Sequence, residues 1–98
     1  MARRALILSR RASIEHEEIA AFSLQRFGHD VADSYMAGLD AVCERLCDFP
    51  ELAPIDPRVR PETRSLHHRS HRILYIVEPT HILIVRILHQ ARATPTAL

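Results

Sequence analysis

Residues 72–88 read RILYIVEPTHILIVRIL, and this stretch decides the fold class. Two apolar runs rich in isoleucine flank the turn-forming segment Glu78-Pro79-Thr80-His81. The pattern predicts two strands, Arg72–Glu78 and His81–Leu88, joined as a β-hairpin. Both runs are almost continuously apolar, which is typical of strands that are covered on both faces. We expect helices to cover one face, and we consider a second chain as the cover of the other.

The segments next to this hairpin complete the C-terminal half. Arg64–His68 predicts one more strand. Residues 50–62 contain four prolines and are expected to form an ordered linker across the surface. The tail from Gln90 to Leu98 is expected to be irregular.

Upstream of the linker, the sequence predicts a long amphipathic helix. Asp30 can cap its start, and Pro50 ends it because proline cannot continue the hydrogen-bond ladder. Its apolar residues recur at spacings of three and four, which places them on one stripe that packs against a neighbour. These residues are Ala32, Tyr35, Leu39, Val42, Leu46 and Phe49.

The N-terminal region predicts a short strand followed by another helix. Ala5–Leu8 is a short apolar run that favours a strand, and Ser9 is a suitable N-cap for a helix that begins at Arg10. This helix is expected to end at about Phe27, before Gly28, and its inward candidates are Ala12, Ile19, Phe22 and Phe27. The order of elements predicts an α+β fold: an N-terminal strand and an antiparallel two-helix hairpin packed on a mainly antiparallel sheet.

Length and composition restrict the class of protein. The chain has 98 residues, room for a single domain over residues 1–98, and a domain this small has a marginal core that a permanent partner could complete. No apolar run approaches the roughly 18 residues that a transmembrane helix needs. Cys43 and Cys47 are four residues apart on the predicted long helix and are interpreted as small buried hydrophobes. We therefore expect a cytoplasmic protein with no membrane association.

Charge is distributed unevenly. Residues 12–53 carry nine acidic and two basic side chains, whereas residues 63–98 carry five arginines, one acid and five of the seven histidines. A basic, histidine-rich C-terminal part suggests an acidic or anionic target, and a solvated basic face is the plainer interpretation.

The side chains offer few sites for chemistry. The chain has only two glycines, so a glycine-rich phosphate loop is excluded, and no zinc motif occurs. His67 and His68 would point to opposite faces of a strand, so we expect no metal site and no cofactor. Arg86 interrupts an apolar strand, and it either pairs with a carboxylate inside the protein or recognises an acidic or phosphate partner. His89 could act as an acid or base, or it could be purely structural.

Several segments together resemble the ParE-type toxins of the RelE/ParE superfamily of bacterial toxin–antitoxin modules. The resemblance covers nearly the whole chain, although Arg69 stands where the family has a glycine. Its most distinctive parts are Ser70-His71-x-Ile73-Leu74-Tyr75-x-Val77 and Val85-Arg86-Ile87-Leu88-His89-Gln90. Leu8-Ser9-Arg10-Arg11-Ala12, Phe27-Gly28 and Leu46-Cys47-Asp48-Phe49-Pro50-Glu51-Leu52 match in the same order.

The resemblance implies a non-enzymatic toxin that inhibits DNA gyrase and is held inactive in a hetero-oligomer with a small ParD-like antitoxin. On this reading the target-facing residues would be Arg86, His89 and Arg92. The antitoxin would bind an exposed apolar sheet edge and helical groove that contain Ile19, Phe22, Leu74 and Ile76.

The same resemblance leaves two alternatives. A ribosome-dependent mRNA endoribonuclease of the RelE type would use Arg72, Arg86 and His89, although the chain contains no lysine and no tyrosine after Tyr75. A member that has lost toxicity would survive as an interaction module.

Overall fold

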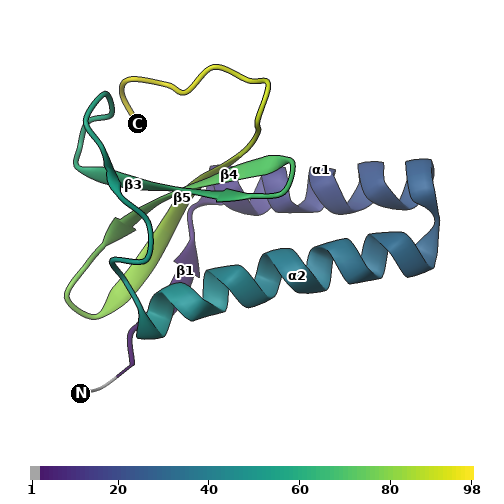
Figure 1. Cartoon of the computed structure of the whole chain (residues 1–98), viewed down its shortest axis with the longest axis horizontal. Helices are drawn as coiled ribbons and strands as arrows, with labels where there is room; N and C mark the ends of the chain where they lie inside the picture. The colour runs from purple at the N-terminus through teal and green to yellow at the C-terminus, as the bar shows by residue number, and fades with distance from the viewer. Residues whose placement is uncertain (1–2) are drawn as a thin grey trace.

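The computed structural model describes residues 3–98, in which two helices pack on a five-stranded sheet (Figure 1). Neither helix has an 18-residue stretch that is apolar enough to span a membrane. The elements, in chain order, are β1 (Ala5–Leu8), α1 (Arg10–Phe27), α2 (His29–Asp48), β2 (Ile55–Asp56), β3 (Thr63–His68), β4 (His71–Val77) and β5 (His81–His89).

The sheet has the strand order β1-β5-β4-β3-β2. Strands β2 to β5 pair antiparallel, and β1 lies parallel to β5, with Leu8 opposite Ile84. The α+β fold predicted from the sequence is therefore confirmed. Two-residue strand β2 was not predicted, because it lies inside the proline-rich segment that we interpreted as a linker.

Local signals account for the ends of the helices. Ser9 caps α1, since its hydroxyl oxygen accepts a hydrogen bond of 3.0 Å from the N–H of Ala12. Gly28 alone joins the helices and has φ 85°, a backbone conformation that glycine adopts readily. The prediction that Asp30 caps α2 is wrong: the helix begins at His29 with Gly28 as its N-cap, and Asp30 lies in the first turn.

The helices bury one stripe against the sheet. Leu39, Cys43, Leu46 and Cys47 of α2 are buried against Ile73, Tyr75, Ile82, Ile84 and Ile87 of the two long strands. Both cysteines are free thiols in this core, as the sequence predicted, and burial raises the pKa of Cys43 to about 12.

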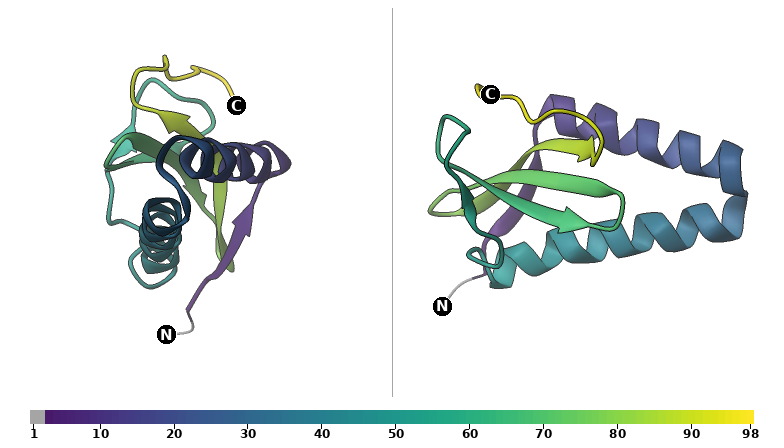
Figure 2. Two further views of the ribbon diagram at one scale, coloured as in Figure 1. Left: turned by 90° about the vertical axis from the view of Figure 1, so that its right-hand side faces the viewer. Right: turned by 45° about the horizontal axis from the view of Figure 1, so that its top comes forward.

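Three aromatic residues that we assigned to the core are at the surface. Phe22, Phe27 and Phe49 expose 61%, 57% and 57% of their area. Phe49 is the C-cap of α2, at the opposite end of the hairpin from Phe22 and Phe27. For Phe22 and Phe27 the reason is geometric: α1 has 18 residues and is about 27 Å long, whereas β1 has four residues. Figures 1 and 2 show that the helical hairpin extends past the sheet, so its far end has no strand to pack against.

The opposite face of the sheet is covered by the same chain. Val59, Leu74 and Leu88 are almost completely buried there without joining the helix-facing core. Two hydrogen bonds hold the C-terminal tail to the β2–β3 connection, from the N–H of Arg60 to the Thr96 carbonyl and from the N–H of Leu98 to the Arg60 carbonyl. The second chain that we considered as a cover for this face is therefore not needed to bury these residues.

Candidate functional site

A buried ion pair joins α1 to β5. The Nε and Nη2 atoms of Arg86 donate to the carboxylate of Glu15 at distances of 2.9–3.2 Å, and Glu15 Oε1 also accepts from the N–H of Ile87 at 2.9 Å. Both side chains are largely inaccessible, with 16% of Arg86 and 7% of Glu15 exposed. Of the two roles left open for Arg86, the structure shows the internal pair. Arg86 is thereby withdrawn from the expected target-facing set.

The ion pair lies where the sheet loses its outer strand. Strand β1 ends at Leu8, and the next residue, Ser9, donates its N–H to the Ile84 carbonyl and its hydroxyl to the Val85 carbonyl. Glu15 then takes the N–H of Ile87. Side chains of the β1–α1 junction therefore satisfy part of the β5 edge that a longer β1 would have covered.

Beyond Glu15, the edge of β5 is open. Gln90 donates its N–H to Ser70, and His89 pairs with His71, so the backbone groups of Ile87 and His89 point away from β4. Within residues 3–98, no strand pairs with β5 on this side after Ile84. The Ile87 carbonyl and the His89 N–H are therefore available to an extended segment of another chain.

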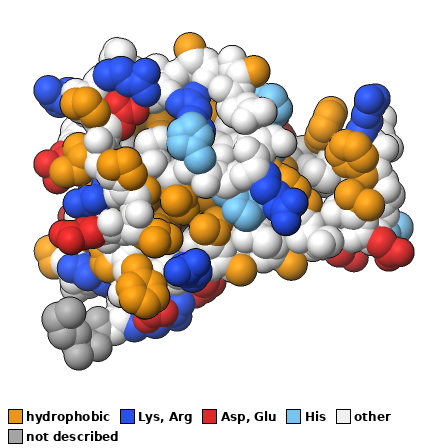
Figure 3. All heavy atoms as spheres, viewed as in Figure 1, with side chains coloured by type: hydrophobic (Ala, Val, Ile, Leu, Met, Phe, Trp, Pro, Cys, Tyr) orange, Lys and Arg blue, Asp and Glu red, His pale blue; other side chains and the backbone are white. Residues whose placement is uncertain are grey.

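Two adjoining hollows lie beside this open edge, and we call them together the hairpin groove. Their volumes are about 340 and 430 Å³, and both are lined by Phe22, His71 and His89. Figure 3 shows the orange apolar side chains at the end of the helical hairpin, with pale blue histidines between them and the body of the molecule. The remaining side chains that matter here are Glu18, Ile19 and Arg92 in the first hollow and Phe27, Val31, Tyr35 and Arg69 in the second.

Two histidines, His71 and His89, line both hollows of the hairpin groove. The Tyr35 hydroxyl is hydrogen-bonded to Nδ1 of His71, and the rings of His71 and His89 lie edge to face with centroids 5.6 Å apart. Burial, followed by the proximity of His89 and His68, lowers the pKa of His71. Burial and the neighbouring Arg69 guanidinium lower the pKa of His68 in the same way.

This arrangement predicts that the protein is less stable in mild acid. A His71 pKa below its ordinary value of 6.5 means that the folded state binds fewer protons than the unfolded state, so stability is lost as the pH falls through this range. A neutral ring can accept the Tyr35 proton at Nδ1, and a protonated ring cannot. We expect the free energy of unfolding, measured by urea denaturation, to fall between about pH 7.5 and about pH 5.5.

The variant His71→Gln should reduce this pH dependence, because only His68 then contributes a lowered histidine pKa in this cluster. A wild-type stability that stays constant or rises on acidification over the same range would contradict the assignment.

Some of the residues predicted to bind a partner lie together in the hairpin groove, and others lie elsewhere in the sheet. Ile19 and Phe22 line the hairpin groove, and so do His89 and Arg92. Leu74 is completely buried and Ile76 partly buried on β4, which lies between β5 and β3. The prediction that Leu74 binds the antitoxin is therefore wrong, because Leu74 is buried on the part of β4 that lies between β5 and β3. Ile76 lies beyond the last β4 residue that pairs with β3, and its role in antitoxin binding stays a prediction.

The residues predicted for a ribonuclease do not form one site. Arg86 is occupied by Glu15, and His89 lines the hairpin groove. Arg72 alternates along β4 with Ile73, which faces the helices, so Arg72 lies on the other face of the sheet. Within the part of the chain that the structure describes, no three His, Cys, Asp or Glu side chains are grouped so that they could hold a metal ion.

The sequence analysis did not assign Phe27, Val31, Tyr35 and His71 to the site. Phe27 and Tyr35 were placed in the core by their helical spacing, which carries no information about where the sheet ends. A useful signal was available in the lengths of the elements, since a two-helix hairpin much longer than its strands leaves apolar side chains uncovered at its end.

The chain matches one family model and is similar in sequence to several known proteins. The family model described as "ParE toxin of type II toxin-antitoxin system, parDE" matches residues 6–94. Toxin ParE1 of Caulobacter vibrioides is 33% identical over 84 residues, covering 86% of each chain. Toxin ParE1 of Mycobacterium tuberculosis is 35% identical over 86 residues, covering 86% of this chain and 87% of the relative.

Two solved structures share the fold. One is described as the chromosomal ParDE TA system from P. aeruginosa, with a TM-score of 0.76, 18% identity, and coverage of 89% of this chain and 96% of the other. The other is the YoeB dimer from Staphylococcus aureus, with a TM-score of 0.55, 17% identity, and coverage of 91% and 99%.

Proposed function

The chain belongs to the ParE toxin family of type II toxin–antitoxin systems, and from this premise we propose that it inhibits DNA gyrase in the cytoplasm and is neutralised by a ParD-like antitoxin. The proposed inhibition acts by binding. Arg86, which the ribonuclease alternative requires, is held in an internal ion pair.

The hairpin groove supports the proposed antitoxin site. Phe22, Phe27 and Val31 are more than half exposed at the end of the hairpin, and such a cluster of large apolar side chains marks a protein-binding surface. The open edge of β5 runs along the same groove and offers hydrogen bonds to an extended segment. Apolar pockets beside a free strand edge suit a peptide that adds a strand and inserts alternate side chains.

The same groove also accounts for neutralisation. His89 and Arg92, the remaining residues of the proposed target-facing surface, line the hollow that contains Ile19 and Phe22. An antitoxin bound there covers both residues, so the toxin cannot present them to gyrase. The single observation that carries this proposal is that His89 and Arg92 line the same hollow as Ile19 and Phe22.

The proposal is tested by expressing the chain in growing bacteria and following DNA and protein synthesis separately by pulse labelling. We expect DNA synthesis to stop first while protein synthesis continues, and co-expression of the cognate ParD-like antitoxin to restore both. Immediate loss of protein synthesis would instead support an mRNA endoribonuclease. Unchanged growth would support a member that has lost toxicity.

A further inference from the structure

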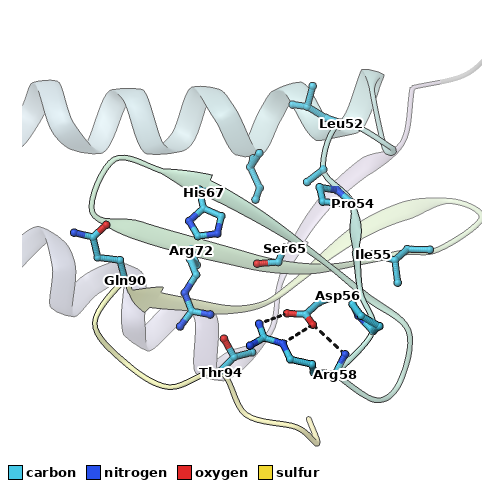
Figure 4. A pocket seen from close by; sticks show the side chains of 13 residues that line it. Leu52, Pro54, Ile55, Asp56, Arg58, Ser65, His67, Arg72, Gln90 and Thr94 are labelled. Carbon is cyan, nitrogen blue, oxygen red and sulfur yellow. Dashed lines mark hydrogen bonds and ion pairs between the residues drawn. The ribbon is translucent and has the colours of Figure 1, made fainter.

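A pocket separate from the hairpin groove lies on the sheet face that is turned away from the helices. It has a volume of about 810 Å³ and is bounded by the β2–β3 region, the face of the sheet and the C-terminal tail (Figure 4). The polar side chains that line it are Asp56, Arg58, Ser65, His67, Arg72, Gln90 and Thr94. The hairpin groove shares none of them.

Arg72 is the unusual member of this pocket. Only 7% of its area is exposed, yet within residues 3–98 it forms no ion pair with a carboxylate. Its Nη2 donates to the backbone carbonyl of Arg92, and its Nε is buried without a hydrogen-bond partner. A buried cation with an unsatisfied donor is costly unless an anion meets it.

Asp56, the acidic residue of the pocket, does not fill this role. Its two oxygens accept hydrogen bonds of 3.0 and 2.8 Å from the guanidinium of Arg58, and Oδ1 also accepts from the Arg58 N–H. These bonds, with a further contribution from the charge of Arg72, lower the pKa of Asp56 to about 2. The lining therefore holds two arginines and one carboxylate, which leaves an excess of positive charge.

We propose that this pocket binds an oxyanion, a phosphate or carboxylate group, through the Nε and Nη2 atoms of Arg72. A single backbone carbonyl satisfies only Nη2, whereas two oxygens of one oxyanion satisfy both donors in parallel. The Ser65 and Thr94 hydroxyls, the Gln90 amide and the His67 ring line the same space and can donate further hydrogen bonds. Nη2 carries two N–H groups, so one stays on the Arg92 carbonyl while the other binds the oxyanion, and residues 91–94 lie next to the filled site. This inference is independent of the proposed action on gyrase.

The test follows the Nε–H resonance of Arg72 by ¹⁵N NMR while inorganic phosphate, and separately acetate, is added to the full chain. We expect a saturable shift of this resonance together with the amides of residues 91–94. The anion that saturates the site at the lower concentration identifies the ligand as phosphate-like or carboxylate-like. Shifts that grow linearly without saturation, or that are equal at every exposed arginine, would overturn the proposal.

Variants make the test specific. Arg72→Lys should abolish saturation because lysine lacks the two parallel donors. Arg58→Gln changes an exposed side chain and frees Asp56 to face Arg72, so anion binding should weaken by about fivefold or more, and circular dichroism checks that the variant is folded. Arg69 lies outside the pocket, so Arg69→Gln should leave the affinity for the anion unchanged. Equal binding by wild type and Arg58→Gln would also overturn the proposal.

Discussion

Replacing Glu15 with alanine is expected to lower the free energy of unfolding by about 3–5 kcal/mol. The substitution leaves Arg86 as a largely buried cation without its carboxylate and removes the acceptor of the Ile87 N–H. For a domain of this size, such a loss is a large share of the total stability, which is typically about 5–15 kcal/mol. Urea denaturation followed by circular dichroism measures it directly.

Matched variants separate the ion pair from helix effects. Glu17→Ala changes an exposed glutamate of the same helix and should alter stability by less than about 0.5 kcal/mol. The double variant Glu15→Leu with Arg86→Met should recover much of the loss, because a buried pair can be replaced by apolar side chains. A loss below about 1 kcal/mol in Glu15→Ala would contradict the buried pair.

Replacing Phe22 with glutamate is expected to weaken binding of the cognate ParD-like antitoxin by about 100-fold or more, the effect of losing a central aromatic anchor. Phe22 is 61% exposed in the free chain and belongs to both hollows of the hairpin groove. The stability of the free protein should therefore change little. Isothermal titration calorimetry with the purified antitoxin gives the affinity.

Phe49→Glu is the control for this variant. Phe49 is 57% exposed, nearly as much as Phe22, but it lies at the end of α2, where it lines a different pocket with Arg4 and Leu52. The antitoxin should bind this variant as tightly as the wild type. If Phe49→Glu weakens binding and Phe22→Glu does not, the antitoxin lies at the other end of the molecule.

Much of the fold could be predicted because its signals are local. The apolar runs around Glu78-Pro79-Thr80-His81, the cap at Ser9 and the break at Gly28 each act within a few residues and predicted the elements where they occur. Strand β2 carried no such signal. Its two residues, Ile55 and Asp56, form a strand only because β3 lies beside them.

The candidate site was less predictable because its parts are distant in the sequence. Glu15 and Arg86 are 71 residues apart, and spacing alone cannot reveal that the short β1 leaves room for their pair. The exposure of Phe22 and Phe27 depends on how far the hairpin extends beyond the sheet, which is a tertiary property. The face on which Arg72 lies follows from strand alternation, but the unpartnered Nε of its guanidinium is visible only once its neighbours are in place.

Supercoiling of relaxed plasmid by purified DNA gyrase tests the central claim most directly. With the purified chain in excess, the account predicts loss of supercoiling, and prior addition of the ParD-like antitoxin restores it. Phe22→Glu should still inhibit gyrase but should no longer be relieved by the antitoxin at the same concentration. Full supercoiling in the presence of excess chain would contradict the account.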